Sequence, residues 1–162
     1  PLILIYVFVL PLVLRFFPLQ KIYFGYKFTL SEIVYIWVSG AITMLLVVNV
    51  LLKNMWGRAR PNDVSYFNGF QDFTPWYKIS DACSSNCSFV SGDSSVGFFL
   101  IVFYFITKKN AYLYLGLILG SLLGFIRIAA GGHFFSDIIF SQIVVTVTIL
   151  VFFVLYKKIY DK

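Results

Sequence analysis

Long uncharged stretches separated by polar segments dominate the chain. A bilayer is crossed by about 20 consecutive apolar residues, and four stretches reach or approach that length: residues 33–52, residues 98–107 extended back through residue 89 by small polar residues, residues 111–126 and residues 138–156. A fifth stretch, residues 1–14, is shorter, and we interpret it as a helix remnant whose upstream part is missing. The pattern predicts an all-α fold, a polytopic transmembrane helical bundle with five visible helices in one domain over residues 1–162.

The connections between these helices are short except for residues 54–88, which we assign to the non-cytoplasmic side. Because long loops of this kind usually carry function, we expect this loop to cover the active site. Its aromatic residues favour anchoring in the headgroup layer over direct substrate contact: Phe70, Phe73, Trp76 and Tyr77. The loop also holds Cys83 and Cys87, which favour a disulfide in an oxidising compartment over a metal site, since metal binding would need more ligands.

Three glycines recur at four-residue spacing in the predicted helix over residues 111–126: Gly116, Gly120 and Gly124. Such a face allows two helices to approach closely. A contact within the bundle is favoured over dimerisation, because every small membrane bundle needs tight internal crossings. The oligomeric state stays open.

The composition agrees with a membrane protein, with 60% hydrophobic and 12% charged residues. A net charge of +6 is also typical of nucleic-acid binding, but here the positions of the basic residues indicate topology instead, and no nucleic-acid partner is predicted. Eight of the 13 basic residues lie in segments that we assign to the cytoplasm, as the positive-inside bias requires: Arg15, Lys21, Lys27, Lys108, Lys109, Lys157, Lys158 and Lys162. The other five lie on the opposite side, where an anionic substrate is the simplest explanation: Lys53, Arg58, Arg60, Lys78 and Arg127.

Two polar clusters lie at predicted helix ends on that side. The first carries three cations, Lys53, Arg58 and Arg60, which are the donors that phosphate binding needs. Lysine snorkelling at a helix end would explain Lys53 but not all three. The second cluster begins a helix with Ser91 as a candidate cap, so the Ser91 side chain and the Gly92 amide are placed to hold a phosphate oxygen. Capping serines also begin many helices that bind nothing.

The third cluster runs from Arg127 through the glycine pair Gly131 and Gly132 to His133 and Asp137. His133 and Asp137 are four residues apart, so on a helix they share a face, and the carboxylate can bond one ring nitrogen. The other nitrogen would then be free to attack, as in an activated nucleophile. A lone histidine is usually structural, but an ionisable group at the end of a membrane helix, paired with Asp and near Arg, indicates function.

Together the clusters resemble the three-part signature of the type 2 phosphatidic acid phosphatase superfamily: Lys53-x6-Arg60-Pro61, Ser91-Gly92, and Arg127-x5-His133-x3-Asp137. The resemblance implies six transmembrane helices, the first of them missing here, and a phosphohistidine formed on His133, which Asp137 orients. It also implies a site without cofactor or metal, and the following phosphate-binding residues: Lys53, Arg60, Ser91, Gly92 and Arg127.

Three positions depart from the family pattern: Val90 replaces a proline, Asp93 a histidine and Ile126 a serine. In the family, the histidine at the position of Asp93 protonates the leaving alcohol. An aspartate among cations stays in its charged form, which makes it a poor acid but a usable base for the water that hydrolyses phosphohistidine. We therefore count Asp93 as a catalytic candidate. Its weak acidity favours a substrate whose leaving group needs little protonation, such as a sugar anomeric phosphate or a lipid diphosphate.

The segments Trp56-Gly-Arg-Ala-Arg-Pro and Asn86-Cys-Ser-Phe-Val-Ser-Gly are most similar to the lipid A phosphatase branch of the superfamily. The resemblance implies a metal-independent lipid phosphatase in the bacterial inner membrane, with its active site facing the periplasm and a phosphorylated membrane lipid as substrate. A polyprenyl diphosphate or phosphatidylglycerophosphate phosphatase is the alternative. An inactive lipid-binding or transport relative is disfavoured, because such a chain has no reason to keep both His133 and Asp137.

Overall fold

The structure is a computed structural model that describes residues 26–160; the predicted helix over residues 1–14 lies outside them. Within the described residues the fold is helical, with an isolated bridge between Val64 and Gln71 and no strands. Three helices are long and apolar enough to cross a membrane: Leu30–Asn54, Asn110–Ala129 and Phe135–Tyr160. The prediction of an all-α, polytopic membrane bundle is confirmed.

The first long helix consists of α3 (Leu30–Ala41) and η1 (Ile42–Asn54), a π-helical continuation. It begins at Thr29 in a capping box, in which the Thr29 side chain accepts from the Glu32 amide and the Glu32 side chain accepts from the Thr29 amide. The observed helix therefore begins three residues before the helix predicted over residues 33–52, at a capped first turn. Lys53 lies in its last turn.

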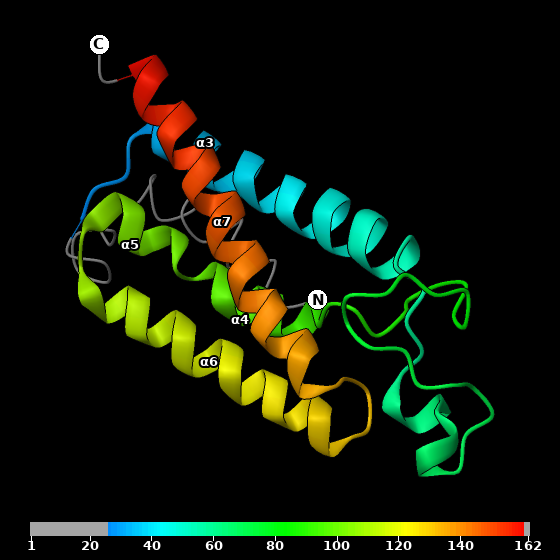
Figure 1. Ribbon diagram of the computed structural model, residues 1–162. Coiled ribbons are helices and arrows are strands. Elements are labelled where there is room, and N and C mark those ends of the chain that lie inside the picture. The colour runs from blue at the N-terminus through cyan, green and yellow to red at the C-terminus, as the bar shows by residue number, and fades with distance from the viewer. Residues whose placement is uncertain (1–25, 161–162) are drawn as a thin grey trace.

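The second apolar region is shorter than predicted and is interrupted. It begins at Gly92 rather than near residue 89, because Ser91 caps it by accepting from the Ser94 amide at 3.4 Å. It then divides at Leu100 and Ile101 into α4 (Gly92–Phe99) and α5 (Val102–Thr107). In the bundle, α4 packs against α6, α7 and η1 (Figure 1).

The last two helices, α6 (Asn110–Ala129) and α7 (Phe135–Tyr160), are joined by a five-residue turn, residues 130–134. A Cβ atom added to any of the three spaced glycines of α6 would collide with a neighbouring helix. Gly116 meets Ile101, Gly120 meets Phe98, and Gly124 meets Ile138. The predicted close contact within the bundle is confirmed.

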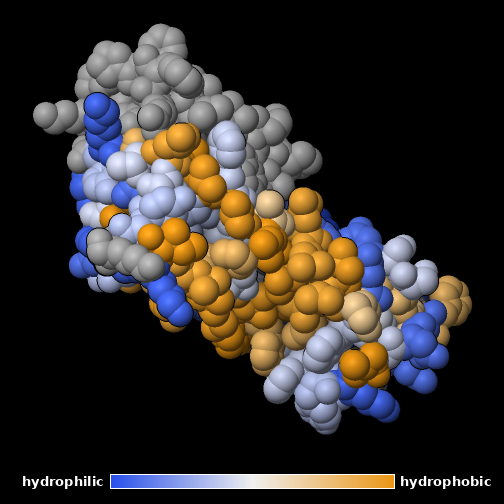
Figure 2. Space-filling view, turned by 90° about the horizontal axis from the view of Figure 1, so that it is seen from above, coloured by the Kyte–Doolittle hydropathy of each residue, from blue (hydrophilic) through white to orange (hydrophobic). Residues whose placement is uncertain are grey.

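The described basic residues separate to the two ends of the bundle. At one end, Lys108 and Lys157 both lie over the ring of Phe153, at 4.5 and 5.7 Å from its centroid. The other end holds the end of η1, the start of α4, the end of α6 and the start of α7. Figure 2 shows a band of apolar side chains between polar ends on one face. Exposed residues of three helices contribute to the apolar surface, among them Leu45, Leu46, Ile118, Leu122, Val147 and Val151.

The long loop between η1 and α4 contains two short helical turns, η2 (Pro61–Asp63) and η3 (Ser65–Phe67). Of its aromatic residues, Phe73 contacts Phe134 with ring centroids 5.4 Å apart, and Trp76 contacts Phe140 at 4.3 Å. These two rings attach the loop to the start of α7. The predicted disulfide is present: Cys83 and Cys87 are bonded, with Cα atoms 5.6 Å apart.

Candidate active site

The three sequence clusters meet at one end of the bundle, each carried by a different helix end. Lys53 lies in the last turn of η1, Ser91 caps α4, and Arg127 lies in the last turn of α6. His133 precedes α7, and Asp137 lies in its first turn.

Backbone hydrogen bonds hold the clusters together. The Ser88 amide donates to the Arg58 carbonyl at 2.9 Å, which joins the first cluster to the second. The Asn62 amide donates to the Gly131 carbonyl at 3.1 Å, which joins the first to the third. Gly131 has a φ of +65°, and a Cβ atom there would collide with the Asn62 side chain, so this turn requires glycine.

His133 is buried, with 2% of its surface exposed, and its ring is fixed by a backbone carbonyl. Its Nδ1 lies 2.7 Å from the Ser88 carbonyl oxygen. Because a carbonyl oxygen only accepts, Nδ1 carries a proton, and in the neutral imidazole Nε2 then carries the lone pair. The direct bond predicted between His133 and Asp137 is not formed, since Nδ1 lies 3.7 Å from Asp137 Oδ2.

Asp137 is fully buried, and its carboxylate is occupied by other donors. Oδ1 pairs with Arg58 Nη1 at 2.5 Å. Oδ2 accepts from the Ser88 hydroxyl at 2.5 Å and from the Phe134 amide at 2.9 Å. Ser88 therefore contacts both partners, with its carbonyl on His133 and its hydroxyl on Asp137. Asp137 is therefore linked to His133 by hydrogen bonds through Ser88, and it lies within ion-pair distance of the ring without the direct hydrogen bond that the spacing predicted.

Arg58 also differs from its sequence interpretation as one of three cations available to phosphate. Its side chain is 2% exposed and lies over the Phe134 ring, with Cζ 4.1 Å from the centroid. Besides Asp137, the guanidinium donates to the Thr74 carbonyl at 2.8 Å and to the Ser136 hydroxyl at 2.9 Å. Burial lowers the pKa of Arg58, whereas Asp137 opposes that shift. Arg58 thus joins the long loop to the start of α7.

The other cations form a separate group, in which Arg60 and Arg127 are half-buried and Lys53 is buried. Arg127 Nε lies 3.2 Å from Asp93 Oδ2, in an ion pair whose side chains are 34% and 60% exposed. Lys53 is within electrostatic range of Arg60, Asp93 and Arg127. Lys53 thus lies near two other cations and one carboxylate, which leaves positive charge in excess at this end of the bundle and suits an anionic phosphate group.

The start of α4 lies beside this group. A Cβ atom on Gly92 would lie 3.3 Å from Lys53 Nζ, so the lysine head approaches the first amides of the helix closely. Helix N-termini attract anions through unpaired amides and the helix dipole. Ser91 and Gly92 thus lie beside Lys53, as the sequence indicated, although the Ser91 oxygen also caps α4.

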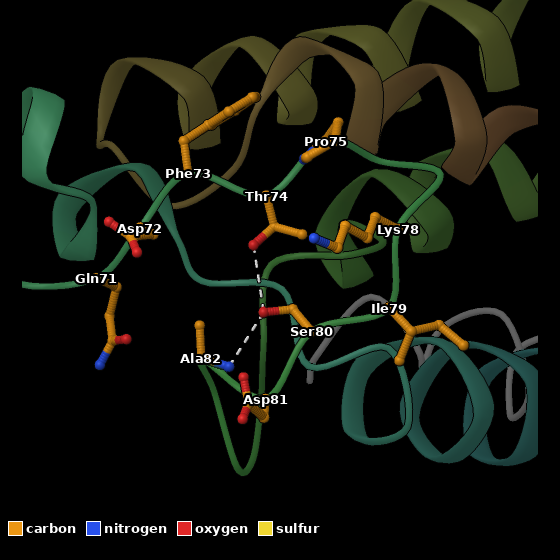
Figure 3. A pocket seen from close by; sticks show the side chains of 10 residues that line it. All are labelled: Gln71, Asp72, Phe73, Thr74, Pro75, Lys78, Ile79, Ser80, Asp81 and Ala82. Carbon is orange, nitrogen blue, oxygen red and sulfur yellow. Dashed lines mark hydrogen bonds between the residues drawn. The ribbon is translucent and has the colours of Figure 1, made fainter.

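A cavity of about 430 Å³ in the long loop does not involve these residues. Figure 3 shows the side chains that line it, and Thr74 and Ser80 are hydrogen-bonded at 3.2 Å across it. The described residues contain no group of three or more His, Cys, Asp or Glu side chains suited to holding a metal ion.

Sequence reasoning missed the roles of two residues at the site. Ser88 has no assigned role in the sequence analysis, and its contacts with His133 and Asp137 span 45 and 49 residues. Asn86, which contacts both Lys53 and Arg60, was not singled out as a site residue. Neither residue follows a spacing that local sequence rules recognise.

The chain is similar to curated proteins named lipid A 4′-phosphatase. That of Francisella tularensis subsp. novicida is 43% identical over 118 residues, which cover 70% of this chain and 53% of that protein. That of Rhizobium leguminosarum is 35% identical over 98 residues, covering 59% of this chain and 42% of that protein. That of Rhizobium etli is 35% identical over 97 residues, covering 58% and 38%. The chain spans about half or less of the length of these relatives.

No solved structure matches the chain significantly. The family model of the PAP2 superfamily matches residues 33–161, which is most of the chain and includes all three clusters of the site. The expected six-helix architecture of the family is represented in the described residues by three long helices and the divided α4–α5 segment. The chain belongs to the PAP2 superfamily.

Proposed function

We propose that this protein is a metal-independent lipid phosphatase that removes the 4′-phosphate of lipid A through a phosphohistidine on His133. The family match supports phosphatase chemistry, and the names of the relatives support lipid A and its 4′-position. The substrate is a phosphorylated membrane lipid, reached from the bilayer in which the bundle lies.

The observation that carries the proposal is the orientation of His133. The Ser88 carbonyl holds the proton on Nδ1, so Nε2 is the nucleophilic atom without prior proton transfer. The imidazole is buried, so its orientation is fixed before substrate binds. Asp137 contributes by fixing Ser88 and the start of α7.

Lys53, Arg60 and Arg127 are proposed to bind the phosphoryl oxygens, together with Ser91 and the Gly92 amide. Charge is spread over these oxygens in the transition state of phosphoryl transfer, and fixed cations stabilise it without reorganising. The pairing of Arg127 with Asp93 is exposed, so an incoming phosphate can exchange with that carboxylate.

In the proposed reaction, His133 Nε2 attacks phosphorus and the bond from phosphorus to the sugar oxygen breaks. The 4′-hydroxyl is an ordinary alcohol. It is neither the anomeric sugar oxygen nor the phosphate of a diphosphate, the leaving groups that the weak acidity of Asp93 led us to expect. The leaving oxygen therefore needs a proton, and the substrate supplies it when it enters as the phosphate monoanion. Asp93 then takes a proton from water as the water attacks phosphorus, the bond from phosphorus to Nε2 breaks, and that proton passes to the released phosphate.

Topology supports a periplasmic active site in the inner membrane. Apart from Lys78 in the long loop, the described cations outside the site flank helix ends on the side opposite His133: Lys27, Lys108, Lys109, Lys157 and Lys158. The positive-inside bias assigns that side to the cytoplasm.

The test is phosphate release from lipid A in proteoliposomes, with excess chelator present, for the wild type and His133→Gln. We expect release from the 4′-position by the wild type alone. Polyprenyl diphosphate and phosphatidylglycerophosphate in parallel reactions test the alternative substrates. Release that persists in His133→Gln, or that disappears from the wild type with chelator, contradicts the mechanism.

A further inference from the structure

We propose that Asn86 is a positioning residue that sets Lys53 and Arg60 for phosphate, and that the Cys83–Cys87 disulfide holds it there. The inference rests on the proposed function, because it takes these two cations as the phosphate-binding groups.

Asn86 contacts both cations with different atoms. Its side-chain Oδ1 accepts from Lys53 Nζ at 3.0 Å. Its backbone carbonyl accepts from Arg60 Nη2 at 2.6 Å and from Arg60 Nε at 3.2 Å. Its amide donates to Asn54 Oδ1 at 3.3 Å. One loop residue thus fixes the relative positions of two cations that approach from the end of η1 and from the loop that follows it.

The backbone at Asn86 favours this arrangement. Its φ of +49° lies in the left-handed region, where asparagine is among the residues best tolerated. The residue lies inside the five-residue ring that the disulfide closes, directly before Cys87, which is fully buried. A closed ring limits the conformations available to the carbonyl, so the disulfide keeps it directed at Arg60.

The charge of the acceptor matters as much as its geometry. An amide oxygen orients an ammonium or guanidinium group without cancelling its charge. A carboxylate in place of the side-chain amide would pair with Lys53, and its negative charge near both cations would compete with phosphate for them. A neutral acceptor therefore holds the cations in position while leaving their charge available to an anion.

The decisive experiment compares Asn86→Asp and Asn86→Gly with the control Asn68→Asp. Asn68 is an exposed asparagine of the same loop with a φ of +69°, and none of its hydrogen bonds reaches a site residue. Aspartate and glycine both tolerate left-handed backbone, so neither change disturbs the turn. The probe is orthovanadate, titrated calorimetrically on the purified full-length protein in detergent micelles. No lipid substrate is needed.

We expect Asn86→Asp to weaken vanadate binding about tenfold or more, because it places a negative charge on the cations. Asn86→Gly keeps the carbonyl on Arg60 and loses only the Lys53 contact, so its loss is smaller, about two- to fivefold. Asn68→Asp is expected to bind vanadate as the wild type does. In lipid A hydrolysis, Asn86→Asp is expected to raise KM more than it lowers kcat. A purely structural role of Asn86 would lower thermal stability in Asn86→Asp and Asn86→Gly without a selective loss of anion binding.

Removing the Cys83–Cys87 disulfide tests its role separately from that of Asn86. Cys83→Ser with Cys87→Ser releases the carbonyl from Arg60, so vanadate binding is expected to weaken at least as much as in Asn86→Gly. Unchanged binding in this double variant would refute the role of the disulfide, and unchanged binding in Asn86→Asp would overturn the role of Asn86. If the wild type hydrolyses lipid A but Asn86→Asp binds vanadate as tightly as the wild type does, only the proposed role of Asn86 fails. If vanadate binding behaves as expected but no lipid A is hydrolysed, the proposed function alone fails.

Discussion

Two arginines two residues apart, Arg58 and Arg60, lie in contrasting environments at the same end of the bundle. Arg58 is buried, pairs with Asp137 and lies against the Phe134 ring. Arg60 is half-buried, and its partner is the carbonyl of exposed Asn86. The first is saturated with contacts inside the protein, whereas the second is held by a neutral acceptor.

The difference shows how one basic segment serves two purposes. A cation buried with its counter-ion has no charge to offer a ligand and fixes structure around itself. A cation held by an amide oxygen keeps its charge and is fixed only in position. Apart from Lys78, the basic residues at this end of the bundle therefore have two roles: Arg58 is an internal anchor, and Lys53, Arg60 and Arg127 form the proposed phosphate site.

The largest effect is expected from Arg58→Gln. Removing one partner of a buried ion pair leaves Asp137 uncompensated and costs on the order of 3–5 kcal/mol. Thermal unfolding in micelles should show a large fall in the midpoint, with reduced yield. Lys78→Gln, which removes an exposed loop cation, is the control and should unfold as the wild type does. An unfolding midpoint unchanged in Arg58→Gln would contradict the anchor role.

The same substitution at Arg60 should act on activity instead. Loss of one preorganised donor at a charge-stabilising site lowers kcat/KM about 10²–10³-fold. The unfolding midpoint should remain within about 2 °C of the wild type, because the side chain is partly exposed and its loss is expected to cost under about 0.5 kcal/mol. If Arg60→Gln instead unfolds early and retains activity, the contrast between the two arginines is lost.

A smaller effect is expected from Ser88→Ala. Ser88 contacts both Asp137, the partner of Arg58, and His133, the proposed nucleophile. The variant loses the hydroxyl on Asp137 Oδ2 but keeps the carbonyl on His133. Asp137 Oδ2 keeps the Phe134 amide, and the loss of one hydrogen bond to a charged group costs about 1.5–3 kcal/mol, so stability should fall by less than in Arg58→Gln. Turnover of the folded fraction should fall only a few-fold. A loss of turnover as complete as in His133→Gln would show that the hydroxyl, not the carbonyl, orients the histidine.

The sequence predicted the long helices well because apolar runs and caps are local features. The helix predicted over residues 111–126 is α6, and that over residues 138–156 is α7, each extended at its ends. The division of the second helix at Leu100 and Ile101 was not predicted, since both residues continue the apolar run.

Motif spacing predicted that the three clusters meet at one end of the bundle, but it did not predict how their residues pair. The four-residue spacing of His133 and Asp137 suggested a direct bond, yet Asp137 pairs with Arg58, 79 residues earlier in the chain. That pairing depends on how the long loop folds over α7, which no local pattern encodes. Asn86 was missed for the same reason, because its partners lie 26 and 33 residues away.

The central claim, that His133 Nε2 carries the phosphoryl group, is tested most directly by trapping the intermediate. Lipid A labelled with ³²P at the 4′-position is mixed with Asp93→Asn, which should slow hydrolysis of the intermediate, and the reaction is quenched within milliseconds. We predict an acid-labile, alkali-stable label on the peptide that contains His133, and no label in Asp93→Asn combined with His133→Gln. Label on another residue, or labelling that survives His133→Gln, would contradict the claim.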